Sequence, residues 1–199
     1  SDDSCAVISI RGTIGTSKSW LSNLYSAMLP AEGSILLPNH KTETYYKLAS
    51  DKKASVHSGW LFSMLILAEE IVPELTGISK LGYSNVYIFG HSQGGGIAFL
   101  LRSYLEYLKE TNPFLKNFNY KTYCSAAPKP GNLYYAYDYE WLTRDGSAYN
   151  IVNVADWVPE VPFSIQTTKD FNDINPFTNI KSEFRELPFP YGMVLISYY

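Results

Sequence analysis

Several features that define common protein classes are scarce in this sequence. Its 199 residues include two cysteines, too few for a disulfide scaffold, and three histidines that have no cysteine neighbours at zinc-binding spacing. Lys and Arg number 16 against 19 Asp and Glu, and the formal net charge of −3 excludes a nucleic-acid binder built on bulk positive charge. No uninterrupted apolar run approaches the ~20 residues that a membrane-spanning helix needs. We therefore expect no metal site, no nucleic-acid partner and no transmembrane helix.

Apolar residues, in contrast, are abundant enough for a hydrophobic core. Hydrophobic residues make up 46% of the chain and charged residues 18%. A chain of this length buries roughly 70% of its unfolded surface, so the composition argues against disorder and fits one domain. Aromatic residues reach 16%, including 17 tyrosines, which pack their rings while keeping a hydroxyl in water.

Hydrophobic periodicity predicts an alternation of strands and helices. We predict strands over residues 5–10, 83–89, 121–126 and 149–154, and helices over residues 59–75 and 93–110. Pro73 is expected to kink or end the first helix. Residues 14–55 give mixed signals and are predicted to be mostly loop, with a short helix beginning at Trp20. The alternation favours an α/β layer fold with a largely parallel sheet.

The turn between the second strand and the second helix carries the clearest chemical signal. Its sequence, Gly90-His-Ser-Gln-Gly94, has a serine at the centre of a Gly-x-Ser-x-Gly pattern. In a strand-to-helix turn this pattern holds the serine hydroxyl above the sheet, beside backbone N–H groups at the helix N-terminus. A glycine-rich turn with an incidental serine is the alternative, but Gly95 and Gly96 also allow close helix packing and favour the nucleophile Ser92.

Other segments occur in a fixed order around this turn. They are Ile8-Ser-Ile-Arg-Gly-Thr13, Trp20, Val56-His-Ser-Gly-Trp60, Tyr87-Ile-Phe-Gly-His-Ser-Gln-Gly-Gly95, Ala127-Pro-Lys-Pro-Gly-Asn132 and Ile151-Val-Asn-Val-Ala-Asp-Trp-Val-Pro159. Taken together, from about residue 5 to residue 162, they resemble the class 3, or fungal-type, triacylglycerol lipases of the α/β-hydrolase superfamily. The resemblance implies a single α/β-hydrolase domain over residues 1–199, with a largely parallel central sheet flanked by helices. The domain is expected to be incomplete at both ends, because the family carries strands upstream of the first strand seen here.

The same resemblance implies the roles of four residues. Ser92 corresponds to the nucleophile and Asp156 to the acid of the triad, while the backbone N–H groups of Gln93 and Thr13 correspond to the oxyanion hole. Gln93 departs from the family's usual leucine. The residues themselves also favour Asp156, which follows a predicted strand where α/β sheets place catalytic groups, although a turn-capping aspartate is the alternative. Four other aspartates are predicted to lie in loops and are poorer candidates: Asp138, Asp145, Asp170 and Asp173.

The catalytic base is missing from the expected position. The superfamily order is Ser, then Asp, then His, yet no histidine follows Asp156. His91 adjoins the nucleophile and cannot readily turn back to its hydroxyl, His57 is expected to pack or to form hydrogen bonds, and His40 is expected at the surface. We therefore predict a catalytic histidine beyond Tyr199.

The predicted activity is hydrolysis of carboxylic esters, most simply lipid esters such as acylglycerols, through an acyl-enzyme on Ser92. No cofactor is expected, and the expected partners are an ester or lipid substrate and a lipid interface. Two alternatives stay open: a hydrolase-like domain that has lost catalysis and binds a ligand in its cleft, and an esterase or thioesterase for non-lipid esters. The sequence leaves the compartment open, with a secreted or cell-envelope location favoured.

Two further features give structural expectations. The aromatic cluster Tyr134-Tyr-Ala-Tyr-Asp-Tyr-Glu-Trp141 could line a substrate groove or an interface, although packing is the commoner role of such clusters. Cys5 and Cys124 each lie in a predicted strand, and in the family's strand order the nucleophile strand separates them. We therefore expect two buried free thiols rather than a disulfide.

Overall fold

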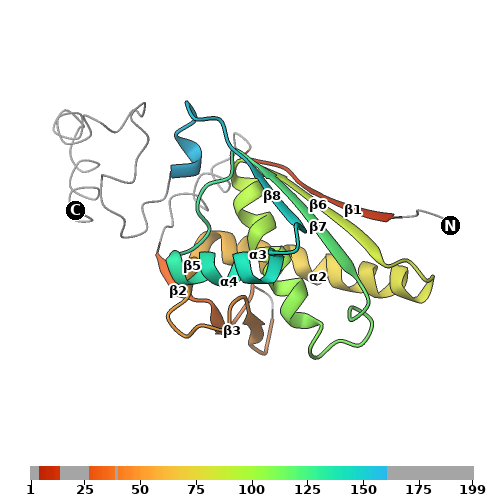
Figure 1. The fold of residues 1–199 in the computed structure, drawn as a ribbon. Helices are drawn as coiled ribbons and strands as arrows, with labels where there is room; N and C mark the ends of the chain where they lie inside the picture. The colour runs from red at the N-terminus through yellow and green to blue at the C-terminus, as the bar shows by residue number, and fades with distance from the viewer. Residues whose placement is uncertain (1–4, 14–26, 39, 161–199) are drawn as a thin grey trace.

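A computed structural model describes residues 5–13, 27–38 and 40–160. At its centre is a four-stranded parallel sheet in the order β1-β6-β7-β8. The strands are β1 (Cys5–Ile10), β6 (Asn85–His91), β7 (Asn119–Ser125) and β8 (Ala148–Ile151). The helices are α2 (Ser58–Lys80), α3 (Gln93–Leu108) and α4 (Leu133–Thr143), and Figure 1 shows them gathered on one face of this sheet. The predicted α/β layering with a parallel sheet is therefore confirmed.

The two faces of the sheet differ because successive side chains of a strand point to opposite sides. On β6, Val86 and Ile88 are buried against the helical layer. The alternate residues point to the other face, where Tyr87 and Phe89 of β6, Tyr123 of β7 and Tyr149 of β8 form a row of stacked rings with successive centroids 6.5, 5.3 and 5.1 Å apart. Among the described residues, no helix covers this second face (Figure 1).

Helix α2 runs further than its sequence pattern indicates. Pro73, expected to kink or end the first helix, lies inside the helix, which continues to Lys80, so the expectation that it ends the helix is wrong. Leu75, two residues after Pro73, is buried, and a buried leucine contributes about 1.5–3 kcal/mol, which offsets most of the ~3 kcal/mol that proline costs in a helix interior. Within the described part of the chain, none of the helices has the length and apolarity needed to cross a membrane.

The stretch predicted to be mostly loop contains three short strands, and a fourth begins at its last residue, Ser55. They form two antiparallel ladders, β2 (Met28–Pro30) with β5 (Ser55–His57) and β3 (Glu32–Ile35) with β4 (Thr44–Lys47). Strands of three or four residues are too short for an alternating pattern to stand out, and Pro30 and Gly33 weaken the signal further. The short helix predicted at Trp20 lies outside the described residues.

The two cysteines differ in their surroundings. Both are free and β6 separates their strands, as expected, but only Cys124 is buried. Cys5 is exposed, so the prediction of two buried thiols is wrong for this residue. The prediction that residues 5–10 form a strand holds, but Val7 is 61% exposed and Ile10 is the one buried residue of the strand. In the described residues β1 is an outer strand, with one edge unpaired and one face uncovered.

Candidate active site

Ser92 lies at the sharp turn between β6 and α3. Its backbone has φ 53° and ψ −128°, a left-handed conformation that L-residues rarely adopt and that stores about 1–3 kcal/mol. Hydrogen bonds hold it there: the Ser92 N–H donates to Ser125 O at 2.9 Å, and Ser92 O accepts from the N–H groups of Gly95 and Gly96 at 2.8 and 3.2 Å. The half-buried serine therefore stands at the carboxyl edge of the sheet and the N-terminus of α3.

Neighbouring backbone segments approach this turn so closely that glycine is required. A Cβ atom added to Gly94 would collide with the carbonyl oxygen of Ile10 and lie 2.5 Å from that of Arg11. A Cβ on Gly90 would lie 2.7 Å from the Cα atom of Gly95. The end of β1 thus packs directly against Gly94, and the end of β6 packs against the first turn of α3, which together account for the glycines on both sides of the serine.

The two segments predicted to form an oxyanion hole meet at the same place. Gln93 is the first residue of α3, and its side chain is 7% exposed, so it points into the protein. A Cβ on Gly12 would lie 2.9 Å from His91 O and 3.4 Å from the Cβ of Ser92. Gly12 therefore contacts the nucleophile turn directly, and Thr13 is the next residue in the chain.

Asp156 lies at the same edge of the sheet, five residues after β8. Its strand neighbours β7, which neighbours the serine-bearing β6. The half-buried Asp156 accepts a hydrogen bond from the Val158 N–H at 3.0 Å through Oδ1, and its own N–H donates to Asn153 O at 2.9 Å. These bonds start the 3₁₀ helix η1 (Val158–Glu160), so Asp156 caps a turn in this structure.

The three histidines each have structural contacts. Nδ1 of His91 lies 3.0 Å from the Ser125 hydroxyl oxygen. His57 is completely buried, accepts the Trp60 N–H through Nδ1 at 3.3 Å and stacks on the Trp60 ring with centroids 3.9 Å apart. Nε2 of His40 lies 2.7 Å from a carboxylate oxygen of Glu69 near the surface. The expectations for His57 and His40 are confirmed, and a catalytic histidine beyond Tyr199 stays a prediction.

Asp138 has a role that sequence analysis missed. It lies on α4 rather than in the predicted loop, and it is 8% exposed. Its Oδ1 accepts hydrogen bonds from the Ser50 N–H at 2.9 Å and the Ser50 hydroxyl at 2.7 Å, and Oδ2 accepts one from the Tyr107 hydroxyl at 2.7 Å. Burial, followed by this bond to the carboxylate, raises the pKa of Tyr107 well above its usual range. Asp138 therefore joins α4, α3 and the segment after β4, and no local sequence signal could identify partners so far away along the chain.

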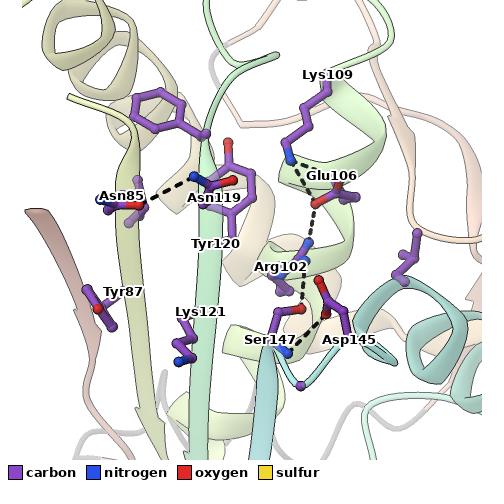
Figure 2. A pocket seen from close by; sticks show the side chains of 14 residues that line it. Asn85, Tyr87, Arg102, Glu106, Lys109, Asn119, Tyr120, Lys121, Asp145 and Ser147 are labelled. Carbon is purple, nitrogen blue, oxygen red and sulfur yellow. Dashed lines mark hydrogen bonds and ion pairs between the residues drawn. The ribbon is translucent and has the colours of Figure 1, made fainter. Parts of the chain in front are cut away.

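A polar cavity of about 420 Å³ lies at the opposite, amino edge of the sheet (Figure 2). Its charged centre is the guanidinium of Arg102, whose side chain is 4% exposed and forms an ion pair at 2.5 Å with Glu106 one turn along α3. Lys109 reaches the same carboxylate at 2.9 Å, and Arg102 also donates to the Ser147 hydroxyl at 3.4 Å. Buried charge at this edge is thus paired, and the cavity is separate from the serine turn. Among the described residues, no group of three or more potential metal ligands lies together.

Comparisons with known proteins agree with this architecture. The family model described as "Lipase (class 3)" matches residues 7–166. The chain is 22% identical to the M37 lipase, with a TM-score of 0.56, covering 81% of this chain and 49% of that one. A fungal lipase structure matches at 22% identity with a TM-score of 0.52, covering 80% of this chain and 49% of that one.

A lipase from Rhizopus microsporus var. chinensis matches at 22% identity with a TM-score of 0.50, covering 81% of this chain and 50% of that chain. At these identities the solved structures bear on the fold alone. The chain spans about half the length of each of these three lipases. None of the curated proteins matches this chain.

Proposed function

The chain belongs to the class 3 lipase family, and from that membership we propose that it hydrolyses carboxylic esters of lipids with Ser92 as the nucleophile. The observation that carries the proposal is the backbone of Ser92, held at φ 53° between a parallel strand and the N-terminus of α3. A left-handed conformation at a non-glycine residue is costly, and such strain is concentrated at functional sites. The three surrounding backbone hydrogen bonds maintain it.

In the proposed reaction the hydroxyl oxygen of Ser92 attacks the acyl carbon, and its proton passes to a histidine oriented by Asp156. The carbonyl oxygen becomes an oxyanion that accepts hydrogen bonds from the backbone N–H groups of Gln93 and Thr13. The C–O bond to the leaving alcohol then breaks, and the alcohol takes the proton from the histidine. Water repeats the sequence on the acyl-enzyme, which releases the carboxylic acid and restores the serine. We propose that the histidine lies outside residues 1–199.

Exposed apolar side chains beside Asp156 support a lipid ester as the substrate. Val152 is 45% exposed, Val154 74% and Trp157 45%, and all three lie in the segment that follows β8 at the edge of the sheet where Ser92 stands. Exposed apolar side chains at this edge of the sheet favour acyl chains, which lose about 0.8 kcal/mol of unfavourable hydration per buried CH₂ group. Small polar esters would gain nothing from them.

A fluorophosphonate tests the nucleophile, because it forms a covalent bond to an activated serine oxygen and releases fluoride. We expect the complete protein, as its cell produces it, to gain one adduct located on Ser92, and Ser92→Ala to gain none. A series of p-nitrophenyl esters from acetate to palmitate then tests the substrate, with faster hydrolysis of long chains expected. An unlabelled wild-type protein would instead support a hydrolase-like binding domain, and a preference for acetate would support an esterase for non-lipid substrates.

A further inference from the structure

Helix α4 is apolar on its outward side as well as on its inward side. Inward, Tyr135 is 2% exposed and Tyr139 packs against the core. Outward, four large side chains are open to solvent, which we call the outer α4 stripe: Leu133 at 47% exposed, Tyr134 at 39%, Tyr137 at 59% and Trp141 at 63%. A surface helix normally turns a polar face to water, so a helix with large apolar side chains on its outer face as well as its inner face indicates that something covers the outer face.

The stripe is continuous and has cations at both ends. At 100° per residue, its four side chains fall within about 100° of arc and extend about 12 Å along the helix. The ammonium nitrogen of Lys53 lies 5.3 Å from the centroid of the Tyr134 ring, and the guanidinium carbon of Arg144 lies 3.6 Å from that of the Trp141 ring. Glu140 is the exposed acidic residue on the margin of the stripe.

We propose that the outer α4 stripe binds the surface of an anionic lipid layer, an inference that rests on the lipase function proposed above. Tyrosine and tryptophan have an apolar ring and a polar atom, and they are enriched where hydrocarbon meets water. Lysine and arginine side chains attract anionic headgroups, each contributing about 1 kcal/mol near a charged membrane. The charged groups of Lys53 and Arg144 lie over the rings of Tyr134 and Trp141, so positive charge is present at both ends of the stripe.

The small size of the stripe favours a lipid surface over a protein partner. Stable protein interfaces use about 20–30 residues on each side, whereas the stripe offers four side chains on one helix. A few amphipathic side chains suffice for reversible attachment to a lipid surface, because one side of the contact is fluid and adapts to their shape. A second copy of the chain is therefore the less favoured occupant.

The position of α4 suits a protein that takes its substrate from a lipid layer. The helix begins shortly after β7, at the edge of the sheet where Ser92 stands. The connecting segment packs against the nucleophile turn, since a Cβ on Gly95 would lie 2.6 Å from the Cβ of Ala127. Attachment through Leu133 and Tyr134 would thus hold that edge of the sheet near the lipid.

Sedimentation with vesicles tests the proposal on the complete protein. We expect binding to phosphatidylglycerol vesicles to be stronger than binding to phosphatidylcholine vesicles. The double variant Tyr137→Ser with Trp141→Ser should lower affinity for the anionic vesicles about tenfold or more, and Arg144→Gln about fivefold. The matched control is Phe114→Ser, which removes another exposed ring, 44% open to solvent and 5.2 Å from the ammonium nitrogen of Lys80. This control should bind as the wild type does.

Three results would overturn the proposal: unchanged vesicle binding of the double variant, an equal loss of binding in Phe114→Ser, or a wild-type dimer that the double variant converts to a monomer.

Hydrolysis of a water-soluble short-chain ester separates this proposal from the proposed function. We expect the double variant to hydrolyse that ester at the wild-type rate, because its changes are confined to the outer face of α4. A wild type that binds vesicles but hydrolyses no ester would contradict the enzymatic proposal and leave the lipid-binding result standing.

Discussion

The contact between β1 and the nucleophile turn can be tested by replacing one Cα hydrogen of a glycine with a methyl group. In Gly94→Ala the new methyl group would collide with the carbonyl oxygen of Ile10 and lie 2.5 Å from that of Arg11. Both are backbone atoms of the segment that leads to Thr13, so neither can move aside as a flexible side chain would. The methyl group therefore has to push the end of β1 away from α3.

The magnitude follows from two opposing contributions. Alanine is favoured over glycine in a helix by about 1 kcal/mol, whereas overpacking typically costs about 1–3 kcal/mol and more where backbone must move. We expect a net loss of about 2 kcal/mol of unfolding free energy, or roughly 4–8 °C in Tm for a chain of this size. The proposed hydrolysis should fall further, by about 100-fold if the Thr13 N–H moves by about 1 Å.

Gly77→Ala is the matched control. Gly77 is also helical, and a Cβ there would meet no atom within 4 Å. Its substitution should raise the free energy of unfolding by about 0.5–1 kcal/mol, because only the helix preference changes. Thermal unfolding followed by circular dichroism measures both variants. A Gly94→Ala protein as stable as Gly77→Ala would refute the close approach of β1 to the serine turn.

Three further predictions concern residues away from the serine turn. At pH 8 a thiol reagent should label the exposed Cys5 within minutes but Cys124 only after denaturation. Burial raises the pKa of the Cys124 thiol to about 12 and keeps the thiol protonated and unreactive. Mass spectrometry of the labelled peptides measures the extent of labelling at each cysteine. Asp138→Ala should lower the free energy of urea unfolding by about 2–3 kcal/mol, since two donors of Ser50 and the hydroxyl of half-buried Tyr107 lose their acceptor, and a loss below 0.5 kcal/mol would contradict the network. Glu106→Gln should cost about 3 kcal/mol in the same assay by leaving the buried Arg102 without its carboxylate, whereas Arg102→Met should cost less.

Sequence patterns identified the parts of the fold whose signals are local. The turn around Ser92 was recognisable because the Gly-x-Ser-x-Gly motif, the preceding strand and the following helix are adjacent in the chain. The strands β2 to β5 were missed because three or four residues carry too little periodicity to distinguish a strand from a loop. The end of α2 was misplaced because proline commonly stops a helix, whereas this helix continues past Pro73 with Leu75 buried, a tertiary effect that the local sequence does not show.

In the candidate site, too, the sequence identified the residues that belong to recognisable motifs and missed those that do not. The segments of Ser92, Gln93 and Thr13 meet as the family resemblance implied, and Asp156 lies at the same edge of the sheet. Their catalytic roles stay predictions. Asp138 could not be found, because its partner Ser50 is 88 residues away in the chain and neither residue belongs to a recognisable motif.

The pairing of β1 with β6 has a consequence for how the protein reaches its native state. Cys5 is in register with Asn85, so about 80 residues must be closed into a loop before these strands form their ladder. Non-local parallel pairing of this kind is slow, whereas β6, the serine turn and α3 are contiguous and can assemble early. During refolding, Ser92 would therefore acquire its turn before the segment around Gly12 reaches it. Recovery of the proposed ester hydrolysis should lag behind recovery of helical circular dichroism, so the hydrolysis signal would report the closure of the longest loop between the described strands of the sheet.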